Sequence, residues 1–375
     1  MNIYLLKNSI IDKLSVINRL VPKKADLNVL NFFKIETNEN KIYLYSTDLE
    51  LAYKSSIPAK VIESGEFLIP AKQFSEIINN FYEEEIQIES KGDNLLIKGE
   101  NTFCSLVGIL KEEYPLVPEF NKDNYLEIDT ILFENFINKL IINTKTANII
   151  KPELAGIYLY LDNNYLYLVS TDSIRLSEVK LKKDIILTNI NNEIKILIPS
   201  RILEEYLKIR KKPIKTKIYI EEHQLTIDLE DQLLISRLLT LNYPDYKQVI
   251  PKDFNLEIQI DKSEVLKILK LNNVFVNKNK EIKLNFDLDK QEIEFYTFNE
   301  FFGENKNKLK FEIIKNELDD NFELSFNLEF LLDGVRVIDS DKIFVGINIP
   351  TDINITPILI KSVLEDDFIY ILVPL

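Results

Sequence analysis

Few residues in this chain could carry catalysis. His223 is the only histidine, so a histidine triad, a multi-histidine metal site or a histidine relay would depend on it alone. It follows Glu221 and Glu222 at an expected strand turn, which favours a solvated hairpin position. The single cysteine, Cys104, excludes an internal disulfide and a cysteine-clustered metal site. Its alternating neighbours predict a buried strand position. The eight glycines are scattered singly, so the chain has no glycine-rich phosphate loop.

Two Ser-Thr-Asp sequences could suggest a paired-carboxylate site. Ser46-Thr47-Asp48 and Ser170-Thr171-Asp172 stand at corresponding places in two repeats. We therefore favour a turn in which each aspartate accepts hydrogen bonds from backbone amides, with catalysis as the weaker alternative. With no other carboxylate or metal cluster apparent, the sequence predicts a protein that is not an enzyme and that needs no metal or cofactor.

The same pattern recurs along the chain at a spacing of about 125 to 130 residues. Shared features are an Ile-Pro step before a helix, the Ser-Thr-Asp turn and a Tyr-Pro pair. They occur at Leu68–Lys72 and Leu197–Arg201, at Tyr43–Asp48 and Tyr167–Asp172, and at Tyr114-Pro115 and Tyr243-Pro244, with a fainter third copy at Glu294–Asn299 and Leu324–Glu329. Repeats of this length indicate whole domains in tandem. We expect three modules, at residues 1–122, 123–253 and 254–375.

Each module shows an amphipathic helix, a hairpin, a second helix and further strands. In the first module Ile10, Leu14 and Ile17 form a helical stripe, and polar turns separate strands of period two in all three modules. Second helices are expected at Ala71–Phe81, Arg201–Ile209 and Leu328–Val337. The last module should add strands at Ile343–Ile347, Ile353–Ile358 and Phe368–Leu372. The predicted class is α+β, with two helices over one antiparallel sheet in each copy.

Charge is distributed unevenly. The net charge of −14 argues against a nucleic-acid partner. However, residues 200–217 carry seven cations against two carboxylates, and residues 7–24 carry five against one. The chain could therefore present one basic and one acidic face. Charges interrupt the N-terminal apolar stretch, and the final apolar run is too short to cross a bilayer, so we expect a cytoplasmic protein with no membrane partner.

Taken together, the repeats and motifs resemble the bacterial sliding clamp, the beta subunit of DNA polymerase III. The resemblance covers essentially the whole chain. Its strongest points, in order, are Ser46–Glu50, Ile69–Lys72, Ser170–Leu176, Asn242–Tyr246 and Tyr370–Leu375.

That resemblance implies a ring. Two chains of three modules would join head to tail as a homodimer, with helices lining the hole and strands outside. The ring would encircle double-stranded DNA without reading its sequence and tether the replicative DNA polymerase, conferring processivity. For closure, Phe103 to Ile109 is a candidate edge in the first module, and the segment around Lys270 to Val276 lies near the other.

The resemblance also implies two sets of site residues. Positions that face DNA in the family correspond here to Lys24, Lys72, Arg201 and Lys208; Asn79 stands where relatives often keep a basic residue. An apolar groove between the second and third modules would bind short linear peptides of the polymerase and the clamp loader, with Arg175 helping to fix the peptide's register. Its lining would be Leu154, Thr171, Ser173, Ile174, Arg175, Leu176, Pro244, Val249, Phe330, Pro357, Ile371, Leu372, Val373 and Pro374.

Two features depart from the family pattern in that groove. Relatives commonly have Gly-His where Ser173-Ile174 stand, and methionine near the penultimate proline. We therefore expect a different peptide preference. Two other classes remain open on the residues alone: a three-domain structural or adhesion protein, and an enzyme of nucleic-acid metabolism.

Overall fold

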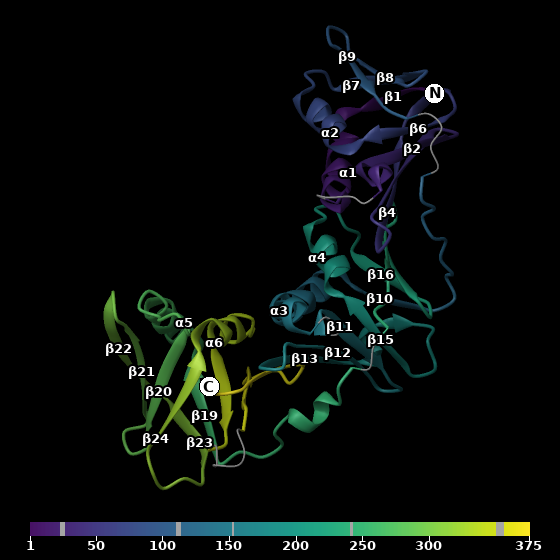
Figure 1. Cartoon of the computed structure of the whole chain (residues 1–375). Helices are drawn as coiled ribbons and strands as arrows, with labels where there is room; N and C mark the ends of the chain where they lie inside the picture. Colours follow the sequence, from purple (N-terminus) through teal and green to yellow (C-terminus); the bar gives the residue numbers. More distant parts are fainter. Residues whose placement is uncertain (23–26, 110–113, 152–153, 241–242, 350–355) are drawn as a thin grey trace. The chain divides into compact units, whose positions relative to one another are not determined.

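The computed structural model describes residues 1–22, 27–109, 114–151, 154–240, 243–349 and 356–375. They form two compact units (Figure 1). Unit 1 comprises Met1–Glu134, Ile185–Asn191 and Ile198–Leu239; unit 2 comprises Asn135–Asp184, Asn192–Leu197 and Thr240–Leu375. Within the described ranges, no helix has the length and apolar character needed to cross a membrane.

Helices come two to a repeat, as predicted. Those of the described residues are α1 (Lys7–Leu20), α2 (Ala71–Asn80), α3 (Thr130–Ile150), α4 (Ser200–Lys208), α5 (Lys262–Asn272) and α6 (Leu328–Arg336). In α1 the stripe of Ile10, Leu14 and Ile17 is buried. Proline precedes α2 and α4 at the N-cap, where a missing N–H costs no helical hydrogen bond. Asp261 caps α5 by accepting from the Glu264 amide at 2.9 Å.

Unit 1 contains two sheets whose neighbouring strands run antiparallel. The five-stranded sheet has the order β5 (Lys60–Glu63), β1 (Asn2–Leu6), β7 (Glu85–Lys91), β8 (Asn94–Lys98), β9 (Phe103–Val107). The nine-stranded sheet has the order β14 (Leu187–Thr188), β10 (Tyr125–Asp129), β16 (Lys215–Ile220), β17 (Gln224–Asp228), β18 (Gln232–Arg237), β4 (Leu51–Pro58), β3 (Lys41–Thr47), β2 (Phe32–Asn38), β6 (Glu66–Pro70).

Unit 2 repeats this arrangement with the sheet sizes nine and four. Its nine-stranded sheet has the order β15 (Ile194–Pro199), β11 (Gly156–Leu161), β12 (Tyr165–Thr171), β13 (Arg175–Lys182), β27 (Phe368–Leu372), β26 (Ile358–Ser362), β25 (Lys342–Ile347), β19 (Leu256–Asp261), β23 (Glu312–Asn316). Its four-stranded sheet has the order β22 (Gly303–Lys310), β21 (Glu292–Asn299), β20 (Glu281–Asp287), β24 (Phe322–Asn327).

The expectation of one sheet per module is wrong. Each repeat divides its strands into a group of four and a group of five, and a nine-stranded sheet joins the four of one repeat to the five of the next. The joining ladders are β4 with β18 and β13 with β27. Alternating residues identify a strand and its buried face but not its partner, so sequence patterns could not separate the groups.

Two smaller expectations differ from what the described residues show. The strand expected at Ile353–Ile358 falls partly on residues outside the described ranges, and β26 begins only at Ile358. Pro357, just before it, has no N–H for a ladder bond. Cys104 is half-buried on the edge strand β9, not buried as expected. The expectation for His223 is confirmed, since its side chain is 78% exposed.

Packing of α6 on β27 depends on a glycine. A Cβ atom at Gly334 would lie 2.2 Å from Cε1 of Tyr370, whose ring is completely buried. The Tyr370 hydroxyl also donates to the Phe330 carbonyl at 2.8 Å. The glycine therefore lets α6 approach β27, the strand that pairs with β13 of the second module.

We expect Gly334→Ala to destabilise the protein. Alanine favours a helix by about 1 kcal/mol, but overpacking against a buried ring costs about 1–3 kcal/mol. Urea denaturation should show a lower midpoint. The matched control is Asn79→Ala, which places the same alanine on the exposed side of α2 without a clash and should not lower the midpoint. An equal or higher midpoint for Gly334→Ala would contradict the packing.

Candidate functional site

The Ser-Thr-Asp sequences form matching turns in the first two repeats. Asp172 Oδ1 accepts from the Ile174 and Arg175 amides at 3.1 and 2.9 Å, and Asp48 Oδ1 accepts from Glu50 and Leu51 at the same two distances. The residue after each aspartate has a left-handed backbone, with φ of 77° at Ser173 and 81° at Leu49. The prediction of an aspartate capping backbone amides is confirmed, and these carboxylates are therefore structural.

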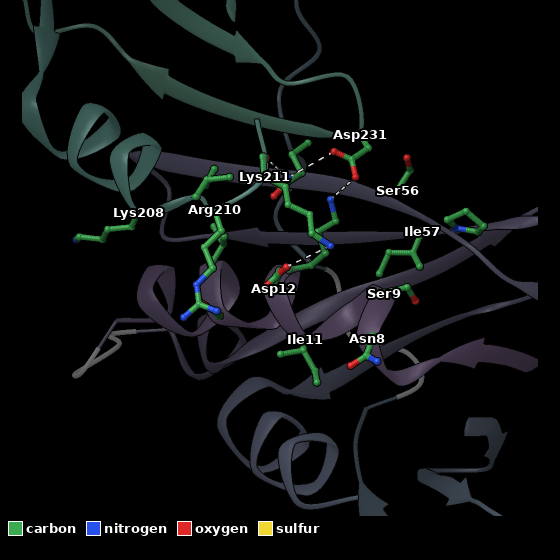
Figure 2. Close-up of a pocket in the computed structure, with 16 residues that line it drawn as sticks. Asn8, Ser9, Ile11, Asp12, Ser56, Ile57, Lys208, Arg210, Lys211 and Asp231 are labelled. Carbon is green, nitrogen blue, oxygen red and sulfur yellow. Dashed lines mark hydrogen bonds and ion pairs between the residues drawn. The ribbon is translucent and has the colours of Figure 1, made fainter. Parts of the chain in front are cut away.

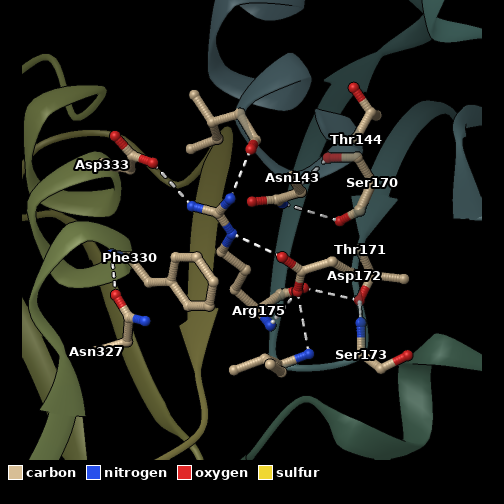
Figure 3. Close-up of polar contacts among 12 residues, drawn as sticks. Asn143, Thr144, Ser170, Thr171, Asp172, Ser173, Arg175, Asn327, Phe330 and Asp333 are labelled. Atoms are coloured by element: carbon tan, nitrogen blue, oxygen red, sulfur yellow. Dashed lines mark hydrogen bonds and ion pairs between the residues drawn. The ribbon is translucent and has the colours of Figure 1, made fainter. Parts of the chain in front are cut away.

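Arg175 follows the second turn and binds three different elements of unit 2 (Figure 3). Its Nε donates to Asp172 at 2.9 Å, one terminal nitrogen to Asp333 on α6 at 2.8 Å, and the other to the Ile142 carbonyl on α3 at 2.7 Å. The guanidinium carbon lies 4.0 Å from the centre of the Phe330 ring. Arg175 thus ties α3 and the β12–β13 turn to α6.

The electrostatic balance at Arg175 favours the charged form. Burial alone would lower its pKa, since the residue is only 4% exposed. The surrounding Tyr370, Asp333 and Asp172 groups outweigh that cost and raise the pKa above its usual value. Removing one partner of such a buried ion pair lowers the stability of the fold, because the other charge is left buried and unpaired.

Beside this network lies a hollow of about 400 Å³. Eleven of the fourteen residues expected in a groove line it: Leu154, Thr171, Ser173, Ile174, Arg175, Leu176, Pro244, Val249, Pro357, Ile371 and Val373. Phe330, Leu372 and Pro374 are not among its lining residues: Phe330 stacks on Arg175, and Leu372 is completely buried in β27. The lining is mainly aliphatic, with Ile174 and Val249 about half exposed.

Sequence reasoning missed three lining residues, Lys151, Asp245 and Tyr246. Tyr246 and Asp245 belong to the Tyr-Pro motif, which could have indicated them. No sequence signal pointed to Lys151, which lies at the rim and donates to Ser173 Oγ at 3.2 Å. Lys151 and Asp245 add one charge of each sign to a mainly apolar surface.

Backbone contacts hold the walls of the hollow in place. The Val373 amide donates to the Ile174 carbonyl at 3.0 Å, and the Leu375 amide donates to the Ser325 carbonyl at 2.8 Å. Next to the lining residue Pro244, Tyr243 stacks on Tyr158, with ring centres 4.6 Å apart. The hollow is therefore built by fixed segments of two repeats before any ligand arrives.

Three of the four residues expected to face DNA lie on helices of unit 1. Lys72 is exposed on α2. On α4, Arg201 forms an ion pair with Asp48, and Lys208 pairs with Glu205 at 2.8 Å. Lys24 lies outside the described residues. Across the described ranges there is no group of three or more His, Cys, Asp or Glu side chains placed to hold a metal ion.

We expect Arg175→Met to lower stability by about 3 kcal/mol, because Asp172 and Asp333 lose their shared cation. The control is Arg237→Met, at an exposed arginine of β18, which should change the urea midpoint little. Equal midpoints for the two variants would show that the Arg175 network does not hold the repeats together.

Comparison with known proteins agrees along the whole chain. Family models for the N-terminal, central and C-terminal domains of the DNA polymerase III beta subunit match residues 1–118, 127–245 and 247–375. Among curated proteins, the chain is 23% identical to the beta sliding clamp of Staphylococcus epidermidis over 89% of each chain, and 21% identical to that of Chlamydia muridarum over 93% of each.

Solved structures show the same fold. The DNA polymerase sliding clamp from Bacillus subtilis aligns over 100% of this chain and 99% of its own, with a TM-score of 0.91 and 22% identity. The DNA polymerase III subunit beta from Pseudomonas aeruginosa aligns over 100% of both chains, with a TM-score of 0.89 and 20% identity. The α+β class in three tandem copies is confirmed, and the chain belongs to the DNA polymerase III beta subunit family.

Proposed function

We propose that the protein is a sliding clamp: a non-catalytic ring of two chains that encircles duplex DNA and tethers the replicative polymerase. One feature of the fold carries this proposal. Both nine-stranded sheets join four strands of one repeat to five of the next, which leaves five strands of the first repeat and four of the third outside any nine-stranded sheet. A second chain placed head to tail would complete the missing sheets.

The repeat also identifies the strands that would pair. In sheet order, β22 corresponds to β4 and β13, and β9 corresponds to β18 and β27. Because β4 pairs with β18 and β13 pairs with β27, β22 of one chain should pair with β9 of another. Both are edge strands, and exposed edges favour pairing with another chain.

Exposed apolar side chains near both edges support this pairing. Phe103 and Val107 on β9 are 64% and 69% exposed, and Phe301 and Phe302, in the turn just before β22, are 82% and 69% exposed. Two such junctions related by a two-fold axis would close the ring. Head-to-tail contacts form a ring when the rotation from each chain to the next leads back to the first chain. Leu271 and Val274, within the segment suggested by sequence, are also exposed.

We expect the protein to have twice its 43.9 kDa chain mass in solution. Phe103→Asp should shift it towards the single-chain mass, because a carboxylate would be buried at the new ladder. Leu116→Asp is the matched control, since Leu116 is 93% exposed and belongs to neither β9 nor β22. Light scattering measures both masses. A single-chain mass for the unaltered protein, or a dimeric Phe103→Asp variant, would contradict the pairing.

For DNA, the candidates are Lys24, Lys72, Arg201 and Lys208. Phosphate attraction independent of sequence suits a ring that must move along the duplex, because base contacts would fix its position. Arg201 and Lys208 have carboxylate partners within the chain, so we expect each to contribute modestly.

We expect Lys72→Glu with Lys208→Glu to slow loading onto primed circular DNA by a clamp loader, and the slowing to lessen as salt is raised. The dimer mass should not change, because Lys72 on α2 and Lys208 on α4 lie outside β9 and β22, the strands proposed to pair between chains. Lys182→Glu with Lys252→Glu reverses two exposed charges elsewhere and should load normally. Normal loading by the first variant would remove these residues from the proposed DNA surface.

For proteins, the hollow of unit 2 is the proposed site for short linear peptides of polymerase and loader. A mainly aliphatic pocket with a few polar rim groups suits the apolar side chains of an extended peptide. With the Arg175 guanidinium already bonded to three groups, its register-fixing role stays a prediction, and we propose the Lys151 ammonium as a further polar contact.

We expect Ile174→Asp to weaken binding of such a peptide at least tenfold, the equivalent of about 1.4 kcal/mol. Ile174 is 41% exposed at the pocket rim, so the fold should tolerate the change while the apolar surface is lost. Fluorescence anisotropy with a labelled short linear peptide of the polymerase measures the affinity, and Leu116→Asp again serves as control. Unchanged affinity would place the peptide elsewhere.

A further inference from the structure

A second hollow lies in unit 1, where α1 faces the segment after α4 and the β17–β18 turn (Figure 2). It encloses about 290 Å³, room for roughly ten water molecules at about 30 Å³ each. Its walls come from the first and second repeats. A backbone hydrogen bond from the Ser56 amide to the Asp231 carbonyl, at 2.9 Å, joins the two repeats at its edge.

The charge of this hollow is opposite to that of the chain. Its charged lining residues are four cations and two carboxylates, an excess of two positive charges in a chain whose net charge is −14. They are Lys13, Lys208, Arg210, Lys211, Asp12 and Asp231. Just outside the lining, Arg19 and Glu205 contact each other at 2.6 Å and add no net charge. The hollow therefore favours an anion.

Both carboxylates of the lining are already paired. Asp231 binds Lys13, whose side chain is 8% exposed, and Asp12 lies 3.8 Å from the Lys211 ammonium. Burial lowers the pKa of Lys13, and the Asp231 contact offsets part of that effect. Lys13 also interacts electrostatically with Asp12, so each carboxylate keeps a cation nearby even when Lys211 turns to a ligand.

Two cations remain available to a ligand. Arg210 is exposed and has no ion-pair partner among the described residues. The Lys211 side chain is 81% exposed and its contact with Asp12 is long; such surface pairs are worth at most about 1 kcal/mol, so Lys211 can turn to a new partner. In Figure 2 Arg210 extends from the loop after α4 alongside α1.

We propose that this hollow is a phosphate-binding site in which the Arg210 guanidinium donates two parallel hydrogen bonds and Lys211 adds a second positive charge. A planar guanidinium matches two oxygens of one phosphate, and an ammonium supplies a flexible point charge. The phosphate could belong to a DNA backbone or to a free phosphorylated molecule, and the two sources share this chemistry.

Calorimetric titration of the full chain with inorganic pyrophosphate tests the site. The unaltered protein should show saturable binding, and Arg210→Gln with Lys211→Gln should weaken it at least tenfold. Arg237→Gln with Lys182→Gln is the matched control, because it removes one exposed arginine and one exposed lysine elsewhere. Absence of binding by the unaltered protein, or equal binding by the two variants, would overturn the proposal.

A short linear duplex identifies the source of the phosphate. If pyrophosphate competes with the duplex and the Arg210 and Lys211 variant binds the duplex more weakly, the ligand is the DNA backbone. If pyrophosphate binding needs these residues but duplex affinity does not, the ligand is a free phosphorylated molecule. Either result supports the site. Because pyrophosphate reports on the hollow without any ring or loader, its failure would leave the proposed clamp function standing.

Discussion

Strand pairing across repeat boundaries is the constraint on which the other features depend. The edge strands of one repeat do not pair with each other. Its group of four strands and its group of five strands each have an edge strand that needs a partner from another repeat. Within the chain, the β4–β18 and β13–β27 ladders satisfy two such pairs of edges. The edge strands β9 and β22 occupy the positions equivalent to these two pairs, and neither has a partner on its open edge among the described strands. The proposed dimer would therefore continue the rule that already joins the repeats.

The same pairing creates the hollow of unit 2. Because β13 pairs with β27, residues 175 and 372 are direct neighbours, and the chain's last residues run beside the β12–β13 turn. Arg175 then reaches Asp333 on α6 and the ring of Phe330. Because the pocket is made from two repeats, it keeps its shape only as long as the β13–β27 pairing holds them together. We therefore regard Arg175 as a structural residue of the pocket and Ile174, Val249 and Lys151 as the residues a ligand would meet.

Local features could be predicted from the sequence because short-range chemistry determines them. The α1 stripe, the hairpin turns and the Asp172 cap all depend on neighbours within a few residues. Contacts between distant residues could not be predicted in that way: nothing near Arg175 indicates a partner 158 residues away. The groove residues came from the family resemblance, which carries long-range information that patterns lack. Even so, the resemblance included Phe330, which stacks on Arg175 and does not line the pocket. It omitted Lys151, which lines the pocket and contacts Ser173 of the β12–β13 turn.

The two hollows suggest a division of tasks within an acidic protein. Unit 2 offers an aliphatic pocket suited to peptides, and unit 1 gathers cations on and after α4, some already paired with carboxylates. Weak, partly paired cations suit a protein held on DNA by enclosure, because strong phosphate contacts would resist sliding. The most direct measurement is retention after loading onto a nicked circular plasmid, before and after one cut that makes the DNA linear. Enclosure predicts slow release from the circle and rapid loss over the free ends; equal release from both forms would contradict it.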